Sequence, residues 1–366
     1  MPAKLPAKLT PLWSHDLTAK GLGGVAATAD IVIVSDRELG DTTDVWKCLA
    51  AATGKELWTV RYPAPGSLDY GNSPRATPVI RDGLVYLAGA FGHVLCVDLA
   101  TGKTVWEVNT HDEFEPAEKP RWGTSSTPLL VDDKLIVNPG AKDASLAALD
   151  AKTGKTLWKA PGRPAGYGSF VLATFGGVRQ VVGHDADSLG GWDAATGRRL
   201  WQLAPDRAGD FNVPTPIPVG DRLLVSTENN GTRLYAFDAA GKIVAKHVAV
   251  HKKLAPDTHT PVVVGDRVFG VWRRLYCLSA DLKLLWDEAD PAFNDYCAIV
   301  TDGTRLLIVS RESEFILLDA AARKFDPISR VKLFDDEKGL YSHPAFVGRR
   351  AYVRGGSAVV AVDLGT

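Results

Sequence analysis

A repeated unit constrains this chain more than any other feature of its sequence. The unit joins an apolar run, an Asp, a Thr-Gly-Lys turn and a closing Trp, and its clearest copy is Leu95-Cys-Val-Asp-Leu-Ala-Thr-Gly-Lys-Thr-Val-Trp106. Further copies end at Trp58, Trp158 and Trp201. Short apolar runs separated by Gly-containing turns are typical of antiparallel strands. We therefore expect an array of β units.

The Asp position of this unit recurs along the whole chain of 366 residues. It falls at Ala50, Asp98, Asp150, Asp193, Asp238, Ser279, Asp319 and Asp363. The mean spacing of roughly 45 residues is the length of one four-stranded propeller blade. Upstream of each mark, turn pairs such as Asp82-Gly83 separate two more strands. The sequence thus predicts an all-β fold, an eight-bladed β-propeller of four-stranded antiparallel blades.

The two ends of the sequence complement each other. The last unit, at about residues 342–366, stops after its third strand, and the missing fourth strand with its Trp lies at about residues 9–17. An N-terminal strand that completes the last blade closes the ring and removes exposed strand edges. We therefore expect residues 1–366 to form a single β-propeller domain, without a helical stretch of note, and the protein to be a monomer.

Each residue type in the unit has an expected structural role. The Asp should accept hydrogen bonds from turn amides, and the Gly should supply a positive φ. The Trp, on the outer strand, should pack against the next blade. Later units depart from the pattern, since Ala245 replaces the Trp and Arg323-Lys324-Phe325 replaces Thr-Gly-Lys. These departures predict looser packing in blades 5 to 7.

Charge and composition exclude several functions. The net charge of −1 gives no bulk electrostatic case for binding nucleic acid or an anionic membrane. No apolar run reaches the roughly 18 residues of a membrane span. The N-terminal residues lack the apolar core of a secretory signal, which leaves a cytoplasmic protein or one whose signal is not in this sequence. The separated cysteines predict buried thiols rather than disulfides or metal ligands; they are Cys48, Cys96, Cys277 and Cys297.

The motif Asp-x-x-Thr-Gly-Lys-x-x-Trp resembles the tryptophan-docking repeat of the PQQ-like propellers. That superfamily includes the quinoprotein alcohol dehydrogenases and the BamB lipoproteins of outer-membrane β-barrel assembly. The BamB-like branch implies a non-catalytic scaffold, protein partners and an exported, periplasmic location. The dehydrogenase branch implies PQQ and Ca²⁺, but its vicinal disulfide over the cofactor has no counterpart here, because no two cysteines are adjacent. Its long ligand-bearing insertions and a Cys-x-x-Cys-His haem site are also missing from this sequence, so we expect no cofactor.

The strand order assigns the candidate site to one face. The loops between blades (D–A) and those between the second and third strands (B–C) share that face, whereas the Thr-Gly-Lys turns lie on the other. The longest D–A loops are residues 62–75 and 110–123. Residues on this face are candidates for binding a small molecule, although a channel mouth can also be polar simply because it holds water. They are Arg75, Trp122, Tyr167, Asn212, His259, Arg273, Tyr296, Arg311, His343 and Arg354.

Arginines in the B–C loops of the last three blades suggest a basic sector. They are Arg273, Arg274, Arg311 and Arg354. Together with His259 and His343, these side chains could bind an anionic ligand or an acidic segment of a partner, since arginine binds carboxylate and phosphate bidentately. The alternative is ordinary surface charge, paired in part with Glu312 and Glu314. We expect no metal between the two histidines, because no carboxylate partner is evident.

No catalytic motif is recognisable in the sequence, whether a nucleophile elbow, a phosphate-binding loop or a catalytic Cys-His pair. The sequence therefore favours a non-catalytic binding or interaction scaffold, with a protein or a small polar or anionic molecule as its ligand. The alternative is an oxidoreductase, or another small-molecule enzyme, with an atypical site in the channel mouth.

Overall fold

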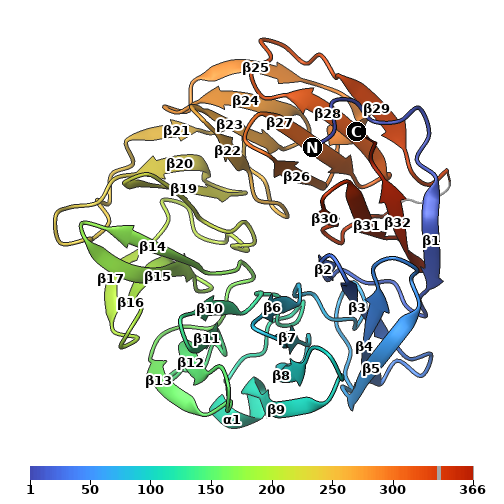
Figure 1. The fold of residues 1–366 in the computed structure, drawn as a ribbon. Coiled ribbons are helices and arrows are strands. Elements are labelled where there is room, and N and C mark those ends of the chain that lie inside the picture. The colour runs from blue at the N-terminus through green and yellow to red at the C-terminus, as the bar shows by residue number, and fades with distance from the viewer. Residues whose placement is uncertain (336–338, 366) are drawn as a thin grey trace.

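The computed structural model describes residues 1–335 and 339–365, and these form eight four-stranded antiparallel sheets arranged in a ring (Figure 1). The predicted eight-bladed propeller is therefore confirmed. Thr366, the last residue of the predicted final blade, lies outside the described residues.

The strands of each blade follow one another in the chain, except in the last blade. Blade 1 contains β2 (Ala26–Ala27), β3 (Ile31–Arg37), β4 (Thr43–Ala50) and β5 (Glu56–Pro63), and blade 2 contains β6 (Val79–Arg81), β7 (Leu84–Ala88), β8 (His93–Asp98) and β9 (Thr104–Asn109). Blade 3 contains β10 (Leu129–Val131), β11 (Lys134–Val137), β12 (Leu146–Asp150) and β13 (Thr156–Ala160). Blade 4 contains β14 (Val171–Phe175), β15 (Val178–His184), β16 (Leu189–Asp193) and β17 (Arg199–Leu203).

Blade 5 contains β18 (Ile217–Val219), β19 (Arg222–Thr227), β20 (Gly231–Tyr235) and β21 (Ala249–His251), and blade 6 contains β22 (Val262–Val264), β23 (Arg267–Val271), β24 (Leu275–Ser279) and β25 (Leu284–Glu288). Blade 7 contains β26 (Cys297–Thr301), β27 (Arg305–Ser310), β28 (Glu314–Asp319) and β29 (Ser329–Lys332). Blade 8 contains β30 (Ala345–Val347), β31 (Arg350–Arg354) and β32 (Ala358–Asp363), together with β1 (Pro11–Asp16).

The N-terminal strand closes the ring as predicted. β1 pairs antiparallel with β32, with Trp13 opposite Ala361 and Asp16 opposite Ala358. Figure 1 shows β1 beside β32, so the two ends of the chain meet in one blade. The last blade can therefore form only when residues more than 300 positions apart in the sequence have come together.

Two short helices lie in the D–A loops, where the sequence predicted none. The first is α1 (Thr110–Phe114), and the second is the 3₁₀ helix η1 (Pro291–Phe293). The Asn109 side chain accepts a hydrogen bond from the first turn of α1, and Asp290 does the same for η1. Asn and Asp are preferred N-caps, so local capping is sufficient to form these single turns.

The core lies between adjacent blades, because each sheet is covered on both faces by its neighbours. The middle strands consequently read as continuous apolar runs; in β28, Phe315 to Leu318 are all buried. All four cysteines are buried and free, as predicted. Burial raises the pKa of Cys48 to about 12 and that of Cys96 to about 11, so these thiols are poor nucleophiles.

The outer-strand tryptophans dock onto the following blade, which confirms their predicted role. The indole Nε1 of Trp106 donates to the Ala151 carbonyl oxygen at 3.0 Å, and that of Trp58 donates to the Leu99 carbonyl at 2.9 Å. Trp13 links the last blade to the first in the same way, through the Ala51 carbonyl at 2.9 Å. Each of these three indoles thus joins two blades by both packing and a hydrogen bond.

The Thr-Gly-Lys turns are built to receive these indoles. Asp150 accepts hydrogen bonds from the Thr153 N–H at 2.8 Å and from its hydroxyl at 2.9 Å, as expected of a turn Asp. These hydrogen bonds lower the pKa of Asp150 below its usual value. Gly154 has φ +73°, and a Cβ at this position would lie 2.8 Å from the Trp106 ring. The glycine therefore supplies both the turn conformation and the space for the indole.

A Gly154→Ala substitution should therefore cost more than backbone strain alone. We expect it to lower the free energy of unfolding by about 2–4 kcal/mol, because the left-handed conformation is unfavourable for Ala and the Trp106 ring must move. Gly83→Ala is the matched control, since Gly83 has φ +76° but a Cβ there would have no neighbouring atom within 4 Å. It should cost about 1 kcal/mol. Equal losses in urea unfolding would show that the indole does not occupy this space.

Blades are also linked near the start of their innermost strands. The Thr77 N–H donates to the Thr127 hydroxyl at 3.1 Å, and the Thr127 N–H donates to the Ser169 hydroxyl at 3.0 Å. Thr77 is followed by Pro78, and this Thr-Pro pair lies just before β6, which begins at Val79. The pair ties one blade to the next, and proline, without an N–H, leaves no donor unsatisfied there.

Candidate functional site

Three aromatic side chains from successive D–A loops form a cluster on the predicted face. Trp122, Tyr167 and Phe211 enter blades 3, 4 and 5, and the Trp122 ring lies 4.9 Å from that of Tyr167 and 4.5 Å from that of Phe211. Phe211 is 49% exposed. We call these three residues the aromatic cluster. The structure therefore brings two predicted site residues together and adds Phe211, which was not among the predicted residues.

Arg75 supports this cluster through the backbone. Its guanidinium donates to the carbonyl oxygens of Trp122 at 2.9 Å and Gly71 at 2.6 Å. It also donates to the Ser73 carbonyl, within its own loop. Because these hydrogen bonds use much of its donor capacity, the structure gives Arg75 a role in fixing two loops relative to each other. Its predicted role in ligand binding stays a prediction.

The loop of residues 62–75 is held by a second arginine, which the sequence pattern did not reveal. Arg37 is 1% exposed and pairs with Asp44, which is fully buried. It also donates to the Ala64 carbonyl at 2.7 Å and to Asp41 at 2.5 Å. Burial raises the pKa of Asp44 to about 6, while the positive charge of Arg37 opposes that rise. Arg37 thus joins a B–C loop to a D–A loop.

Two of the predicted site residues, Asn212 and His259, use their side chains to hydrogen-bond backbone groups. The Asn212 side-chain amide donates to the carbonyls of Asp185 at 3.1 Å and Ala186 at 3.0 Å, and its backbone has φ +57°. His259 is buried, and its Nε2 accepts a hydrogen bond from the Val271 N–H at 2.9 Å. Asn tolerates the left-handed conformation, and the histidine must be unprotonated at Nε2 to accept. Both side chains therefore have structural partners in place.

Tyr296 and His343 lie in the entries to blades 7 and 8. Tyr296 is buried, and its ring centroid lies 5.9 Å from that of Tyr341. Burial raises the pKa of its phenol. The His343 side chain is exposed, and its Nδ1 lies 3.1 Å from the Pro344 carbonyl oxygen. Desolvation by the surrounding protein lowers the pKa of this imidazole.

The predicted basic sector of blades 6 to 8 does not form as expected. Arg354 is 1% exposed, and its guanidinium donates to the Ser35 backbone and hydroxyl and to the Ala19 carbonyl. Arg311 pairs with Asp295 rather than with the neighbouring glutamates, and its guanidinium carbon lies 5.2 Å from the Tyr341 ring centroid. The two arginines are engaged by groups from other parts of the chain, Arg311 by Asp295 and Arg354 by Ser35 and Ala19. Glu314 pairs instead with Arg330.

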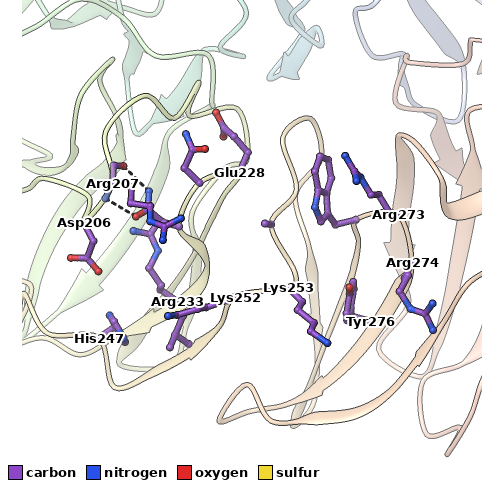
Figure 2. Close-up of a pocket in the computed structure, with 15 residues that line it drawn as sticks. Asp206, Arg207, Glu228, Arg233, His247, Lys252, Lys253, Arg273, Arg274 and Tyr276 are labelled. Atoms are coloured by element: carbon purple, nitrogen blue, oxygen red, sulfur yellow. Dashed lines mark hydrogen bonds between the residues drawn. The ribbon is translucent and has the colours of Figure 1, made fainter.

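A basic cleft between blades 5 and 6 contains the two remaining predicted arginines, Arg273 and Arg274. The cleft has a volume of about 910 Å³, and Figure 2 shows its side chains reaching from both blades. It is lined by Asp206, Arg207, Glu228, Asn229, Asn230, Arg233, His247, Val250, Lys252, Lys253, Ala255, Trp272, Arg273, Arg274 and Tyr276. Most of these belong to D–A and B–C loops, so the cleft opens on the face that the sequence predicted. We call it the basic cleft.

The cleft lies at a junction without a docking tryptophan. The outer strand β21 has only three residues, and Ala245, at the position of the missing Trp, is exposed. Before β21, the chain is joined to the rest of blade 5 by an isolated β-bridge between Phe237 and Ile243. A hydrogen bond from the Val248 N–H to the Leu234 carbonyl follows just before β21 begins. Looser packing was predicted for blades 5 to 7. Blade 5 has this irregular outer edge, whereas Trp286 of blade 6 donates to the Ala322 carbonyl of blade 7 at 2.9 Å. The signal that could have revealed the cleft was two basic pairs, Lys252-Lys253 and Arg273-Arg274, in loops of adjacent blades.

Charge in the cleft is unbalanced. Of its described lining residues, six are Arg or Lys and two are acidic. Arg274 pairs with Asp287, outside the lining set. Glu228 accepts a hydrogen bond from the Phe211 N–H, which also joins the cleft to the aromatic cluster. Burial raises the pKa of Glu228.

His184, in a small cavity beside Arg233, should make stability depend on pH. It is 4% exposed, and neither ring nitrogen has a hydrogen-bond partner among the described residues. Burial, with a smaller effect of the Arg233 charge, lowers its pKa to about 3. The unfolded chain binds a proton below pH of about 6.5, whereas the folded chain does not, so stability falls as the pH falls through this window. At pH 5 the loss is about 2 kcal/mol.

We therefore expect His184→Gln to remove about 2 kcal/mol of the difference in stability between pH 7.5 and pH 5. Urea unfolding at the two pH values measures this difference in the variant and in the parent protein. Some dependence should remain, because burial also lowers the pKa of His259 to about 4. An identical pH dependence in both proteins would contradict this role of His184.

The described residues contain no group of three or more His, Cys, Asp or Glu that could hold a metal ion. The four cysteines are separate buried thiols, so no vicinal disulfide can lie against a quinone ring.

The part of the chain that the structure describes contains no helix long and apolar enough to cross a membrane.

Comparison with solved structures places the fold among known propellers. The chain is similar to BamB from Moraxella catarrhalis, with a TM-score of 0.65 at 18% identity, over 97% of this chain and 99% of that one. It is also similar to the quinohemoprotein alcohol dehydrogenase from Comamonas testosteroni, with a TM-score of 0.64 at 14% identity, over 98% of this chain and 77% of that one. These likenesses show the fold, an eight-bladed β-propeller.

Sequence comparison gives the family. A family model described as outer membrane protein assembly factor BamB matches residues 10–159 and 41–283, well over half of the chain. The chain belongs to this family. It is 24% identical over 327 residues to the outer membrane protein assembly factor BamB of Shewanella oneidensis, covering 84% of this chain and 78% of that protein. A quinone-dependent alcohol dehydrogenase subunit of Gluconacetobacter polyoxogenes is 29% identical over 156 residues, but the match spans only 21% of that protein.

Proposed function

We propose that this protein is a non-catalytic interaction scaffold that binds a protein partner through its D–A and B–C loop face. The observation that carries the proposal is the aromatic cluster on that face, in a chain that belongs to a family of assembly factors. Aromatic and arginine side chains are enriched in the energetically important parts of protein interfaces. Phe211 offers exposed aromatic area, while Arg75 holds the loops behind Trp122 in place.

By family resemblance we also propose that the protein acts after export, in the periplasm, in the assembly of outer membrane proteins. Removing its gene in the source organism should lower the amount of folded outer membrane protein in the envelope. Restoring the parent gene should reverse this effect, whereas a gene with Trp122→Ala and Phe211→Ala should not. Unchanged envelope proteins, together with a loss of dye-linked alcohol oxidation, would contradict the scaffold and favour a quinoprotein.

We also propose that the protein binds neither PQQ nor Ca²⁺. Thermal unfolding with and without PQQ and Ca²⁺ tests it, because a ligand that binds only the folded state raises stability by about 2.7 kcal/mol at 100 times its Kd. We expect no shift of the midpoint. A saturable rise would contradict the proposal.

A further inference from the structure

Arg233 is a buried charge for which no counter-charge is described. It is 4% exposed, it lines the basic cleft, and its Nε has no hydrogen-bond partner among the described residues. Its other nitrogens donate only to neutral oxygens, the Thr227 hydroxyl at 2.8 Å and the Tyr235 hydroxyl at 3.4 Å. A buried charge without an ionic partner is costly, and such groups are normally paired. An anion that enters the cleft would supply that partner.

The charges around Arg233 favour such an anion. Lys252, Lys253 and Arg273 are exposed on the two walls, and no ion pair of theirs is found among the described residues. The lining has two acids: Glu228 accepts a hydrogen bond from the Phe211 N–H, and Asp206 is exposed, so six basic side chains outnumber two acidic ones. The cleft therefore presents positive charge over much of its length, rather than at a single point.

Arg273 is held in a particular position at the cleft mouth. Its backbone has φ +57°, an unfavourable conformation for a residue other than Gly, at the tip of the turn closed by the hydrogen bond from the Trp272 N–H to the Arg274 carbonyl. Its guanidinium carbon lies 5.3 Å from the Trp272 ring centroid. Strained backbone of this kind clusters at ligand sites, and the indole orients the cation toward incoming groups.

We propose that the basic cleft binds carboxylate side chains of an acidic segment of the partner protein, with Arg233 receiving the most deeply buried carboxylate. The inference rests on the proposed scaffold function and specifies the chemistry of its partner. A protein segment fits better than a small inorganic anion, because the cavity of about 910 Å³ is far larger than one anion and has apolar surface at Val250 and Ala255. The cleft also adjoins the aromatic cluster through the hydrogen bond between Phe211 and Glu228.

Fluorescence anisotropy with a labelled hexaglutamate peptide tests the proposal, with hexaglutamine as the uncharged probe. The parent protein should bind hexaglutamate at least tenfold more tightly than hexaglutamine, and binding should weaken as salt is added. Arg233→Met keeps the bulk of the side chain and should weaken hexaglutamate binding at least tenfold, without lowering the melting temperature. The exposed pair Lys252→Glu and Lys253→Glu should do the same and does not touch a buried group.

The matched control is Lys152→Glu with Lys155→Glu, an equal charge change in a Thr-Gly-Lys turn on the opposite face. It should change the Kd by less than twofold. Equal binding of the two peptides, or parent-like binding by both cleft variants, would overturn the proposal. Inorganic phosphate that binds as tightly as hexaglutamate would also overturn it, because it would indicate a small-anion site. If cleft variants lose the peptide but the envelope proteins are unchanged on gene removal, the cleft stands and the proposed function fails.

Discussion

Trp106→Ala should destabilise the protein by about 3–5 kcal/mol, the cost of deleting a large buried side chain. Trp106 is 8% exposed, its indole covers Gly154, and its N–H satisfies the Ala151 carbonyl of the next blade. The substitution therefore removes apolar contacts, opens a cavity between two blades and removes one of the two hydrogen bonds to the Ala151 carbonyl, which the Tyr86 hydroxyl also donates to at 3.1 Å. Urea unfolding followed by far-ultraviolet circular dichroism measures the loss.

Val105→Ala provides the control for this substitution. Val105 precedes Trp106 on the same strand and is 50% exposed, so its truncation should change stability by no more than about 0.5 kcal/mol. A Trp106→Ala protein as stable as the Val105→Ala protein would contradict the account of how the blades are joined.

Arg37→Met should destabilise the protein by about 3–5 kcal/mol at neutral pH, because it leaves the carboxylate of Asp44 buried without its partner. It also frees the Ala64 carbonyl, which anchors the loop of residues 62–75. The loss should be smaller at pH 5. Removing the arginine raises the pKa of Asp44 further, and a carboxyl with a raised pKa costs stability as the pH rises through that value.

Arg61→Met is the matched control, because Arg61 forms an exposed ion pair with Glu38 at 3.3 Å in the same blade. Exposed pairs contribute no more than about 1 kcal/mol. Chemical unfolding of both variants at pH 5 and pH 7.5 separates the two cases. A loss for Arg37→Met that is small and independent of pH would show that the buried pair does not hold this loop.

The propeller could be predicted because its signal is periodic and local. The turn of Asp150, Thr153 and Gly154 is formed within five residues, and the sequence repeats it in other blades. The closing of the ring could be predicted as well, since the strand missing at Asp363 is present around Trp13. In the fold, the single turns of α1 and η1 were not predicted, because they depend on local capping by Asn109 and Asp290.

The site was less predictable, because side chains from different blades meet only in the folded ring. Arg311 and Arg354 were candidates for an anion site, with ordinary paired surface charge as the alternative. In the structure Asp295 pairs with Arg311, and the Ser35 carbonyl on β3 accepts a hydrogen bond from Arg354. Trp122 and Tyr167 were predicted, whereas Phe211 was not, since no local pattern shows that three loop tips converge. The importance of Arg233 depends on a missing counter-charge, which only the folded arrangement reveals.

The most direct test of the scaffold function is photocrosslinking in cells of the source organism. A photoreactive phenylalanine analogue replaces Phe211 in the aromatic cluster and, in a second protein, Lys155 on the opposite face. We expect a discrete adduct from position 211, with an outer membrane assembly protein identified by mass spectrometry, and none from position 155. No adduct at position 211, or the same adducts at both positions, would contradict the claim that this face binds a protein partner.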